Sequence, residues 1–297
     1  RREVESLSSL EALFYFPHIW LFRHWLGLED TPLFQVVDEA TLAGNLAHRV
    51  FEYLLSEEDV LQWDRARLEG WLERTLERLV RQEGVVLLQF GRMAERVALR
   101  RTLARAAWRL LDMLRRGGWR VRATEQRLEG PFAEIRVRGI ADLVLERGDE
   151  LAVVDLKWGG KTYRSELIRN EADIQLTCYA HLTSDGQGFA HTAYFIIKQG
   201  VMLARDDAAF AEAQTIGSTQ APEEVQQTIW HRMEQTWRWR MTQLQHGVLE
   251  VRTGHTREAL DRSANEHLYD FDPNDLFEMK ADDHPFDEYK VLLGQVE

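Results

Sequence analysis

The amino-acid sequence predicts an α/β protein with a helical N-terminal part, in which a central mixed sheet is flanked by helices. Long segments with helical patterning fill the chain up to residue 114 and again from residue 222. A block of strand-like apolar segments lies between them, from 119 to 204, and contains one helix-like segment. Helices that flank one block of strands are typical of α/β proteins.

Each element follows from local signals in chain order. The segment 6–28 is predicted to be helical, with Pro17 as a break. Gly117 and Gly118 end the last of the early helices. The other predicted helices are 41–55, 63–82, 91–114, 171–182 and 222–246. Three strands are predicted in 119–126 and 133–158, then a strand at 190–198 with 201–204 pairing back on it. The remainder is irregular and acidic.

Length and composition limit the possible domain organisation and cellular setting of the chain. The chain has 297 residues, of which 44% are hydrophobic, and no linker stands out, so we expect one domain over residues 1–297. Since the chain lacks an initiator methionine, we expect it to be an excised C-terminal module of a longer protein. It contains no apolar run of membrane-spanning length and no signal-peptide pattern. The single cysteine, Cys178, excludes a disulfide framework and a cysteine-rich zinc site, which favours a reducing, cytoplasmic setting.

The charge is unevenly distributed. The net charge is −12, which argues against a general nucleic-acid coat protein. The stretch 92–122 nevertheless holds ten arginines and only two acidic residues. Such a run indicates either a solvated helix face or a surface that binds phosphates, and in the second case Arg100, Arg101 and Arg105 are the expected nucleic-acid contacts.

The stretch GIADLVLERGDELAVVDLKWGG, residues 139–160, predicts a hairpin with charged residues in an apolar setting. If Gly148 and Asp149 form the turn, Asp142 lies directly opposite Asp155, with Cβ atoms about 5 Å apart. Side chains alternate along a strand, so Asp155 and Lys157 share a face. One interpretation is a solvated ion pair at a strand end. The other is a metal site, because a divalent cation between the two carboxylates removes their repulsion.

The choice of lysine is notable, since only five of the 37 basic residues are lysines and Lys157 is the first of them in the chain. Arginine is permanently charged, whereas the pKa of a lysine can shift when a reaction needs it.

Further candidates lie at helical spacing. Gly44, His48 and Glu52 share one face of the helix 41–55, and Gln175 and Tyr179 are four residues apart on the helix 171–182. Taken singly, each has an ordinary explanation, such as a hydrogen-bonded core histidine or a surface acid.

Taken together and in this order, Gly44-x3-His48-x3-Glu52, Gly139-x2-Asp142, Asp155-x-Lys157 and Gln175-x3-Tyr179 resemble the PD-(D/E)XK nucleases, specifically the RecB/AddB-type branch. SLSSLEALFYFPHIWLFRHWLGL and HPFDEYKVLLG look like the opening and closing segments of that branch, so the resemblance extends over essentially the whole chain. It implies a restriction-endonuclease-like core.

The resemblance also implies roles for the residues. His48, Asp142, Asp155 and the carbonyl of Leu156 would bind Mg²⁺ or Mn²⁺. Lys157 would act on a metal-activated water and on the charge of the phosphate. Gln175 and Tyr179 would position the strand or the lysine. Glu52 would support His48.

One departure from the family pattern concerns an iron–sulfur cluster that many members of the branch hold with four cysteines. The matching positions here are Phe16, His284, Asp287 and Leu293. Such a cluster needs thiolates, so we expect none, and Phe16 and Leu293 are expected to make an apolar contact instead.

The leading hypothesis is a metal-dependent DNA nuclease, expected to act as an exonuclease on DNA ends or single strands in repair, recombination or end processing. It would work with a helicase module or a partner subunit. One alternative is an inactive nuclease-fold module that binds DNA or serves as a scaffold. The other is an acidic helical adaptor in which the motif is a coincidence.

Overall fold

The computed structural model describes residues 2–28, 39–217, 220–251, 271–277, 287–289 and 292–293. The chain divides into two compact units. The first comprises residues 1–34, 129–139 and 224–297, and the second comprises residues 35–128 and 140–223. Strands β2 (Arg120–Phe132) and β3 (Ile135–Arg147) contribute residues to both units. The expectation of one domain over residues 1–297 stays a prediction.

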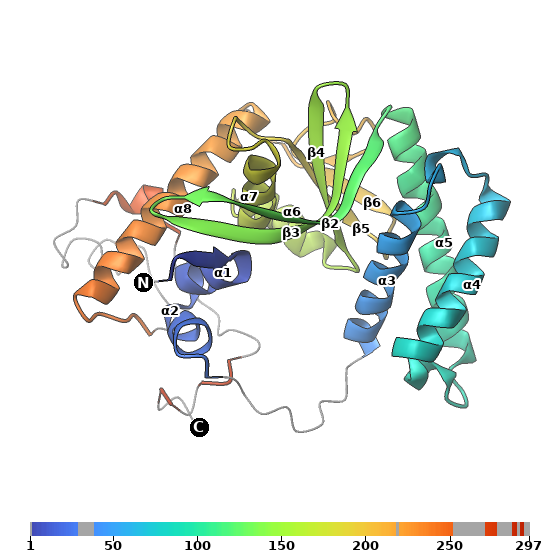
Figure 1. The fold of residues 1–297 in the computed structure, drawn as a ribbon, viewed down its shortest axis with the longest axis horizontal. Coiled ribbons are helices and arrows are strands. Elements are labelled where there is room, and N and C mark those ends of the chain that lie inside the picture. Colours follow the sequence, from blue (N-terminus) through green and yellow to red (C-terminus); the bar gives the residue numbers. More distant parts are fainter. Residues whose placement is uncertain are drawn as a thin grey trace. The chain divides into compact units, whose positions relative to one another are not determined.

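The second unit contains three long helices that lie side by side (Figure 1). They are α3 (Glu39–Leu55), α4 (Arg65–Glu83) and α5 (Met93–Arg116), with the 3-10 turns η2 (Val60–Gln62) and η3 (Val85–Leu88) between them. Asp64 caps α4 by accepting a hydrogen bond from the Arg67 N–H at 2.7 Å. Leu103, Leu110 and Leu114 recur at helical spacing on α5 and are fully buried. The predicted helices 41–55, 63–82 and 91–114 are therefore confirmed.

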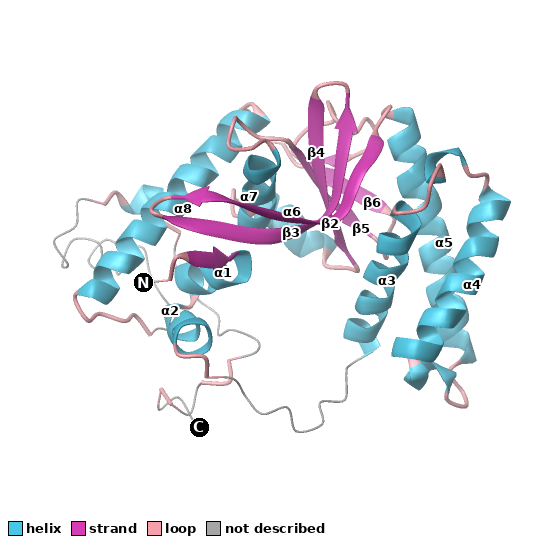
Figure 2. Cartoon of the chain, in the orientation of Figure 1, coloured by secondary structure: helices cyan, strands magenta, loops and turns pink. Residues whose placement is uncertain are grey.

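The strands of the second unit form a mixed sheet (Figure 2). The order is β3-β4-β5-β6-β7, with β4 (Glu150–Lys157), β5 (His191–Ile196), β6 (Val201–Ala204) and β7 (Gln214–Thr215). The pairs β3–β4 and β5–β6 are antiparallel, whereas β4–β5 and β6–β7 are parallel. This mixed, helix-flanked sheet is the fold class that the sequence predicted.

The turn of the β3–β4 hairpin sets its register. Gly148 adopts a φ of +60°, which glycine reaches without steric cost. Arg147 pairs with Glu150, and the pairing continues down the hairpin to Leu143 and Val154. The register predicted from the turn residues is confirmed over this range. The next residues of the two strands are Asp142 and Asp155.

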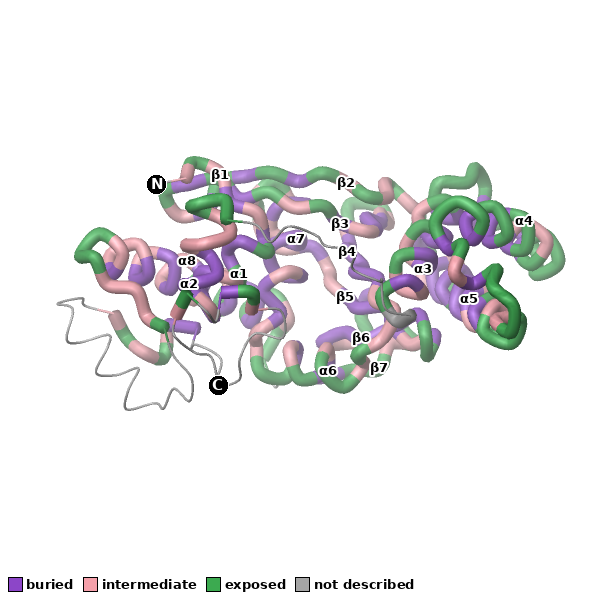
Figure 3. Tube along the Cα trace, turned by 90° about the horizontal axis from the view of Figure 1, so that it is seen from below, coloured by how far each residue is buried: buried purple, intermediate pink, exposed green. Residues whose placement is uncertain are grey.

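The two faces of the sheet pack against different helices. Val154 and Leu156 belong to the large core formed with α3, α4 and α5. Tyr194 and Leu203 pack instead with residues from α6 (Lys161–Arg169) and α7 (Ile174–Thr183). Figure 3 shows the buried stretches along α3, α4 and α5. The sequence predicted α7 as 171–182 and did not predict α6.

The first unit begins with strand β1 (Val4–Ser6), which pairs in parallel with the start of β3. Helix α1 (Leu7–Tyr15) ends at Phe16, and Pro17 starts α2 (Pro17–Ile19), which confirms the predicted break. The unit also contains the π-helical turn η1 (Trp20–Trp25), most of α8 (Pro222–Gln245) and the 3-10 turn η4 (Pro273–Asp275). None of the helices that the structure describes is long and apolar enough to cross a membrane. Most of the predicted irregular acidic region, including 252–270 and 278–286, lies outside the described residues.

The packing of β3 generates a prediction. Leu145 is completely buried and Ile140 on the same strand is 45% exposed. Leu145→Ala is expected to lower the free energy of unfolding by about 2–5 kcal/mol because it leaves a cavity. Ile140→Ala should cost less than about 1 kcal/mol. Urea unfolding of both variants measures the difference, and equal losses would contradict the packing described.

Candidate active site

Strand β4 carries an acid and a base on the face that looks toward α6 and α7. Asp155 is 1% exposed, and its partner in the parallel β4–β5 pair is the buried Tyr194. The Lys157 ammonium lies 3.0 Å from Oδ1 and 2.8 Å from Oδ2 of Asp155. Asp155 and Lys157 therefore share a face, as the strand alternation predicted. Oδ2 receives no well-directed hydrogen bond despite the short distance, so one oxygen of this buried carboxylate is left unsatisfied.

Asp142 on β3 faces the same strand. Its Oδ2 accepts a hydrogen bond of 2.7 Å from the backbone N–H of Leu156. Burial is the main cause that raises the pKa of Asp142 to about 6. Burial also raises the pKa of Asp155 to about 6, with Lys157 opposing the shift and the charge of Asp142 adding to it. The charge of Asp142 thus raises the cost of ionising Asp155.

His48 on α3 comes close to this pair. Its Nδ1 lies 3.9 Å from Oδ2 of Asp142, and its side chain is about one-third exposed. Burial and the positive charge of Lys157 lower the pKa of His48. A neutral imidazole keeps a lone pair that can bind a cation.

Gln175 and Tyr179 come together on α7, which packs on β4. The Gln175 side-chain amide donates to the Tyr179 hydroxyl at 3.2 Å. Tyr179 is 4% exposed, and burial raises its pKa, with the negative charges of Asp155 and Asp142 adding to the rise. The tyrosine is therefore electrostatically coupled to both aspartates.

Two glutamates lie at the margin of the site. Glu52 accepts a hydrogen bond of 3.0 Å from Arg49, which is the residue that follows His48 in α3. Its predicted support of His48 stays a prediction. Glu125 on β2 was not singled out by the sequence. It has a φ of +47°, which is unusual for a non-glycine residue, and its charge contributes to the raised pKa of Asp142. No motif marks Glu125, because only the path of β2 brings it near the hairpin.

The donor set has the chemistry of a hard-cation site. The buried carboxylate of Asp155 and the partly buried one of Asp142 lie on adjacent strands, one oxygen of Asp155 lacks a hydrogen bond, and an imidazole with a lowered pKa lies beside them. Mg²⁺ and Mn²⁺ favour such oxygen ligands, and Mn²⁺ also accepts an imidazole. Within the described ranges, no three His, Cys, Asp or Glu side chains already converge on one point. The predicted ligation, including that by the Leu156 carbonyl, stays a prediction.

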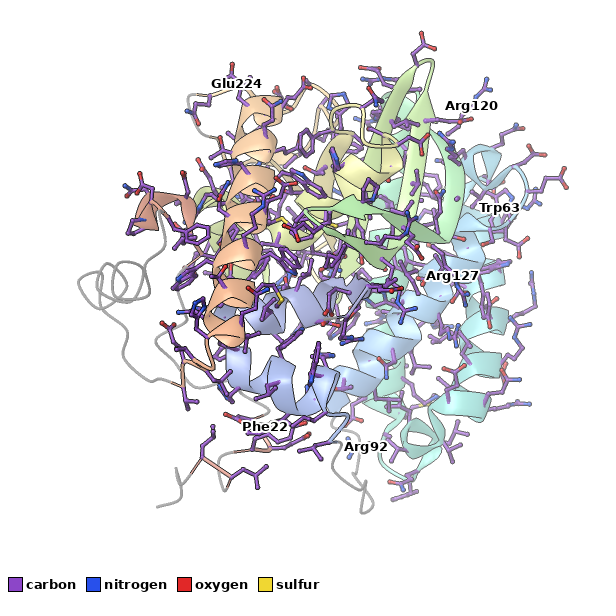
Figure 4. All side chains as sticks on the ribbon, turned by 60° about the vertical axis from the view of Figure 1, so that its left-hand side comes forward. Phe22, Trp63, Arg92, Arg120, Arg127 and Glu224 are labelled. Carbon is purple, nitrogen blue, oxygen red and sulfur yellow. The ribbon has the colours of Figure 1, made fainter. Side chains whose placement is uncertain are left out.

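The three arginines expected to contact nucleic acid lie on α5, and they differ in their contacts. Arg100 forms an ion pair with Glu73 of α4, and Arg105 donates to the Lys198 carbonyl at 2.9 Å. Arg101 is exposed and makes no hydrogen bond or ion pair with another described residue. The basic run is also spread out: Arg92 precedes α5 and Arg120 begins β2 beyond its other end (Figure 4). The helix between them has 24 residues and is therefore about 36 Å long.

At the positions matched to the cluster cysteines, the structure describes Phe16, Asp287 and Leu293, whereas His284 lies outside the described residues. Oδ2 of Asp287 lies 2.9 Å from Nε2 of His18 in a hydrogen bond, and both side chains are buried. The expected contact between Phe16 and Leu293 stays a prediction. The sole cysteine, Cys178, is buried in α7, far along the sequence from these positions.

The raised pKa of Asp142 predicts a stability effect. The folded chain holds this proton up to about pH 6, whereas an unfolded aspartate releases it near 3.8. The metal-free chain therefore loses stability as the pH rises through this window, and the deficit persists above it. Asp142→Asn cannot ionise, and its amide oxygen can still accept from the Leu156 N–H. In EDTA at pH 8 it is expected to raise the free energy of unfolding by about 1 kcal/mol, or roughly 2–4 °C in Tm.

Thermal unfolding at pH 5 and pH 8 measures this gain, which should shrink at the lower pH. Asp149→Asn, in the exposed turn of the same hairpin, is the matched control. A destabilised Asp142→Asn at pH 8 would show that the ionised carboxylate is not under strain.

Residues 5–268 match the family model of the PD-(D/E)XK nuclease superfamily. The matched range contains the whole set from His48 to Tyr179. Comparison with curated proteins gives no match. The RecB/AddB-type branch stays a prediction. The match over most of the chain and the mixed, helix-flanked sheet agree, and the chain therefore belongs to the PD-(D/E)XK nuclease superfamily.

Proposed function

We propose that the protein is a Mg²⁺- or Mn²⁺-dependent deoxyribonuclease that hydrolyses phosphodiester bonds at DNA ends or in single strands. The observation that carries the proposal is the pair of aspartates on adjacent strands, the partly buried Asp142 and the buried Asp155, with Lys157 bound to the second. Membership of the superfamily supports a nuclease-type activity. Exonuclease action, a role in repair and a helicase partner rest on the resemblance to the RecB/AddB-type branch.

Asp142, Asp155, His48 and the Leu156 carbonyl would hold the cation. A bound divalent cation lowers the pKa of a water and offsets charge on the phosphate. The Lys157 ammonium lies close to both oxygens of Asp155 and donates a hydrogen bond to Oδ1, so an oxygen of Asp155 would have to turn from the lysine to bind the cation. The Lys157 ammonium would then be free to donate a hydrogen bond to the attacking water, and its neutral amine form would be able to take the proton of that water.

Gln175 and Tyr179 fit a positioning role. Their mutual hydrogen bond fixes the tyrosine hydroxyl on the face of the sheet that carries Asp155 and Lys157. Burial keeps the phenol protonated, so it can donate a hydrogen bond to a phosphate oxygen or to the reacting water.

The rival proposal is an inactive nuclease-fold module that binds DNA or serves as a scaffold. An inactive module has no need for a lysine bound to a buried aspartate, since that arrangement costs stability. The complete set of His48, Asp142, Asp155 and Lys157 therefore favours the active enzyme.

Lys157 provides the direct test. With Mg²⁺ or Mn²⁺ the purified chain is expected to degrade linear single-stranded DNA, and EDTA should stop it. Lys157→Ala should lower the rate by about 10²–10⁴ while Mn²⁺ still binds, since the lysine acts on the water and not on the ion. Lys157→Arg should not restore the rate, because a guanidinium cannot take a proton.

Lys198→Ala, which removes an exposed lysine of the same unit, is the control and should cleave like the wild type. Equal cleavage by wild type and Lys157→Ala would assign the activity to a contaminant. A wild type that binds Mn²⁺ but never cuts would favour the scaffold.

For DNA binding by α5, we propose Arg101 as the main contact among the three arginines, because Arg100 and Arg105 are already engaged within the unit. Arg101→Ala should weaken binding of all sequences about equally and reduce the salt dependence, as loss of a phosphate contact does. Fluorescence anisotropy at several salt concentrations measures both effects, with Arg100→Ala for comparison. If Arg101→Ala binds like the wild type at every salt concentration, the arginine face of α5 is only solvated.

A further inference from the structure

Arg164 lies close to β4, the strand that carries Asp155 and Lys157, although none of the sequence motifs contains it. Helix α6 starts directly after β4 and the glycines 159 and 160. Gly160 has a φ of +78°, which lets the chain turn sharply, and its carbonyl accepts a 2.9 Å hydrogen bond from the Arg164 N–H. The first turn of α6 thereby carries Arg164 back toward the end of β4.

Two tyrosines hold the guanidinium of Arg164. Its central carbon lies 4.7 Å from the ring centroid of Tyr163 and 5.7 Å from that of Tyr194. Tyr194 is buried and is the strand partner of Asp155, so the two side chains emerge on the same face of the sheet. The positive charge of Arg164 also contributes to lowering the pKa of Asp155. The guanidinium is thus positioned on the reactive face of β4.

The donors of this guanidinium are unused within the described part of the chain. The Nε atom of Arg164 is buried and has no hydrogen-bond acceptor, and no described carboxylate forms an ion pair with it. The Nε atom of Arg205 in the same unit also lacks an acceptor, but arginines with structural roles there do use guanidinium donors. Arg205 donates to Asp173 and to the Ile168 carbonyl, and Arg115 donates to the carbonyls of Leu61 and Trp63.

We propose that Arg164 binds a backbone phosphate of the nucleic-acid strand that lies against β4. A planar guanidinium with free donors matches two oxygens of one phosphate, and stacking on tyrosines keeps it flat and limits its rotamers. Lys157 is engaged with Asp155, whereas Arg164 is a cation on this face whose donors are available to anchor the strand. The inference rests on the proposed function, because it takes the substrate to be a phosphodiester chain.

The test uses a fluorescent single-stranded oligonucleotide in Ca²⁺, together with a series in which one phosphate at a time is replaced by an uncharged methylphosphonate. For the wild type, replacement of the phosphate that Arg164 contacts should weaken binding about tenfold. Arg164→Ala should bind the unmodified strand about tenfold more weakly and be insensitive to replacement of that same phosphate. Arg164→Lys should recover part of the affinity, because it keeps the charge without the fork.

Arg169→Ala is the matched control, since Arg169 is exposed at the other end of α6. It should show the wild-type response at every phosphate. If Arg164→Ala does not fold, as judged by circular dichroism, Arg164→Gln and Arg164→Lys carry the same comparison.

An Arg164→Ala chain that keeps every wild-type methylphosphonate penalty overturns the inference, because the arginine then serves only to pack against the tyrosines. A wild type that binds no strand overturns it as well. A wild type that binds but never cuts in Mg²⁺ or Mn²⁺ contradicts the nuclease proposal alone, since the phosphate contact is measured by binding.

Discussion

The site depends on two carboxylates at neighbouring positions of an antiparallel hairpin, the partly buried Asp142 and the buried Asp155. Each is costly to ionise because burial removes water, and the charge of Asp142 adds to the cost for Asp155. The turn at Gly148 fixes the register that brings them together, since a slip of one residue would send one of them to the opposite face. The surrounding elements supply only part of the compensation: the Leu156 N–H donates to Asp142, and Lys157 pairs with Asp155.

Cationic and neutral side chains surround the two carboxylates. His48 arrives from α3 on one side, and Gln175, Tyr179 and Arg164 arrive from α6 and α7 on the other. Strand β4 can accept these neighbours because its alternate residues, such as Val154, are anchored in the core of the second unit. Strand β4 thus holds charged side chains whose burial is only partly compensated by hydrogen bonds and ion pairs. Such an unfavourable contribution to folding stability is typical of sites that bind a cation and carry out chemistry.

The sequence predicted the hairpin and its register well, because a glycine in a two-residue turn leaves few alternatives and period-two alternation then places every side chain. The long helices α3, α4 and α5 were predictable from leucine spacing. Helix α6 was missed, since it is short and polar and depends on the turn at Gly160. Arg164 and Glu125 were missed for a related reason: their proximity to the site comes from tertiary packing, which no local spacing encodes. The sequence overestimated the number of arginines on α5 that are free to bind phosphates. A count of charges does not reveal which of them already contact other residues.

The central claim is that the facing aspartates exist to hold a divalent cation. Crystals of the chain soaked in Mn²⁺ and measured at a wavelength where manganese scatters anomalously test it most directly. We expect one strong anomalous peak within about 2.0–2.3 Å of carboxylate oxygens from both Asp142 and Asp155, with His48 nearby, and Asp155 turned from Lys157. A fully soaked crystal with no peak there, and with the Asp155–Lys157 pair unchanged, would contradict it.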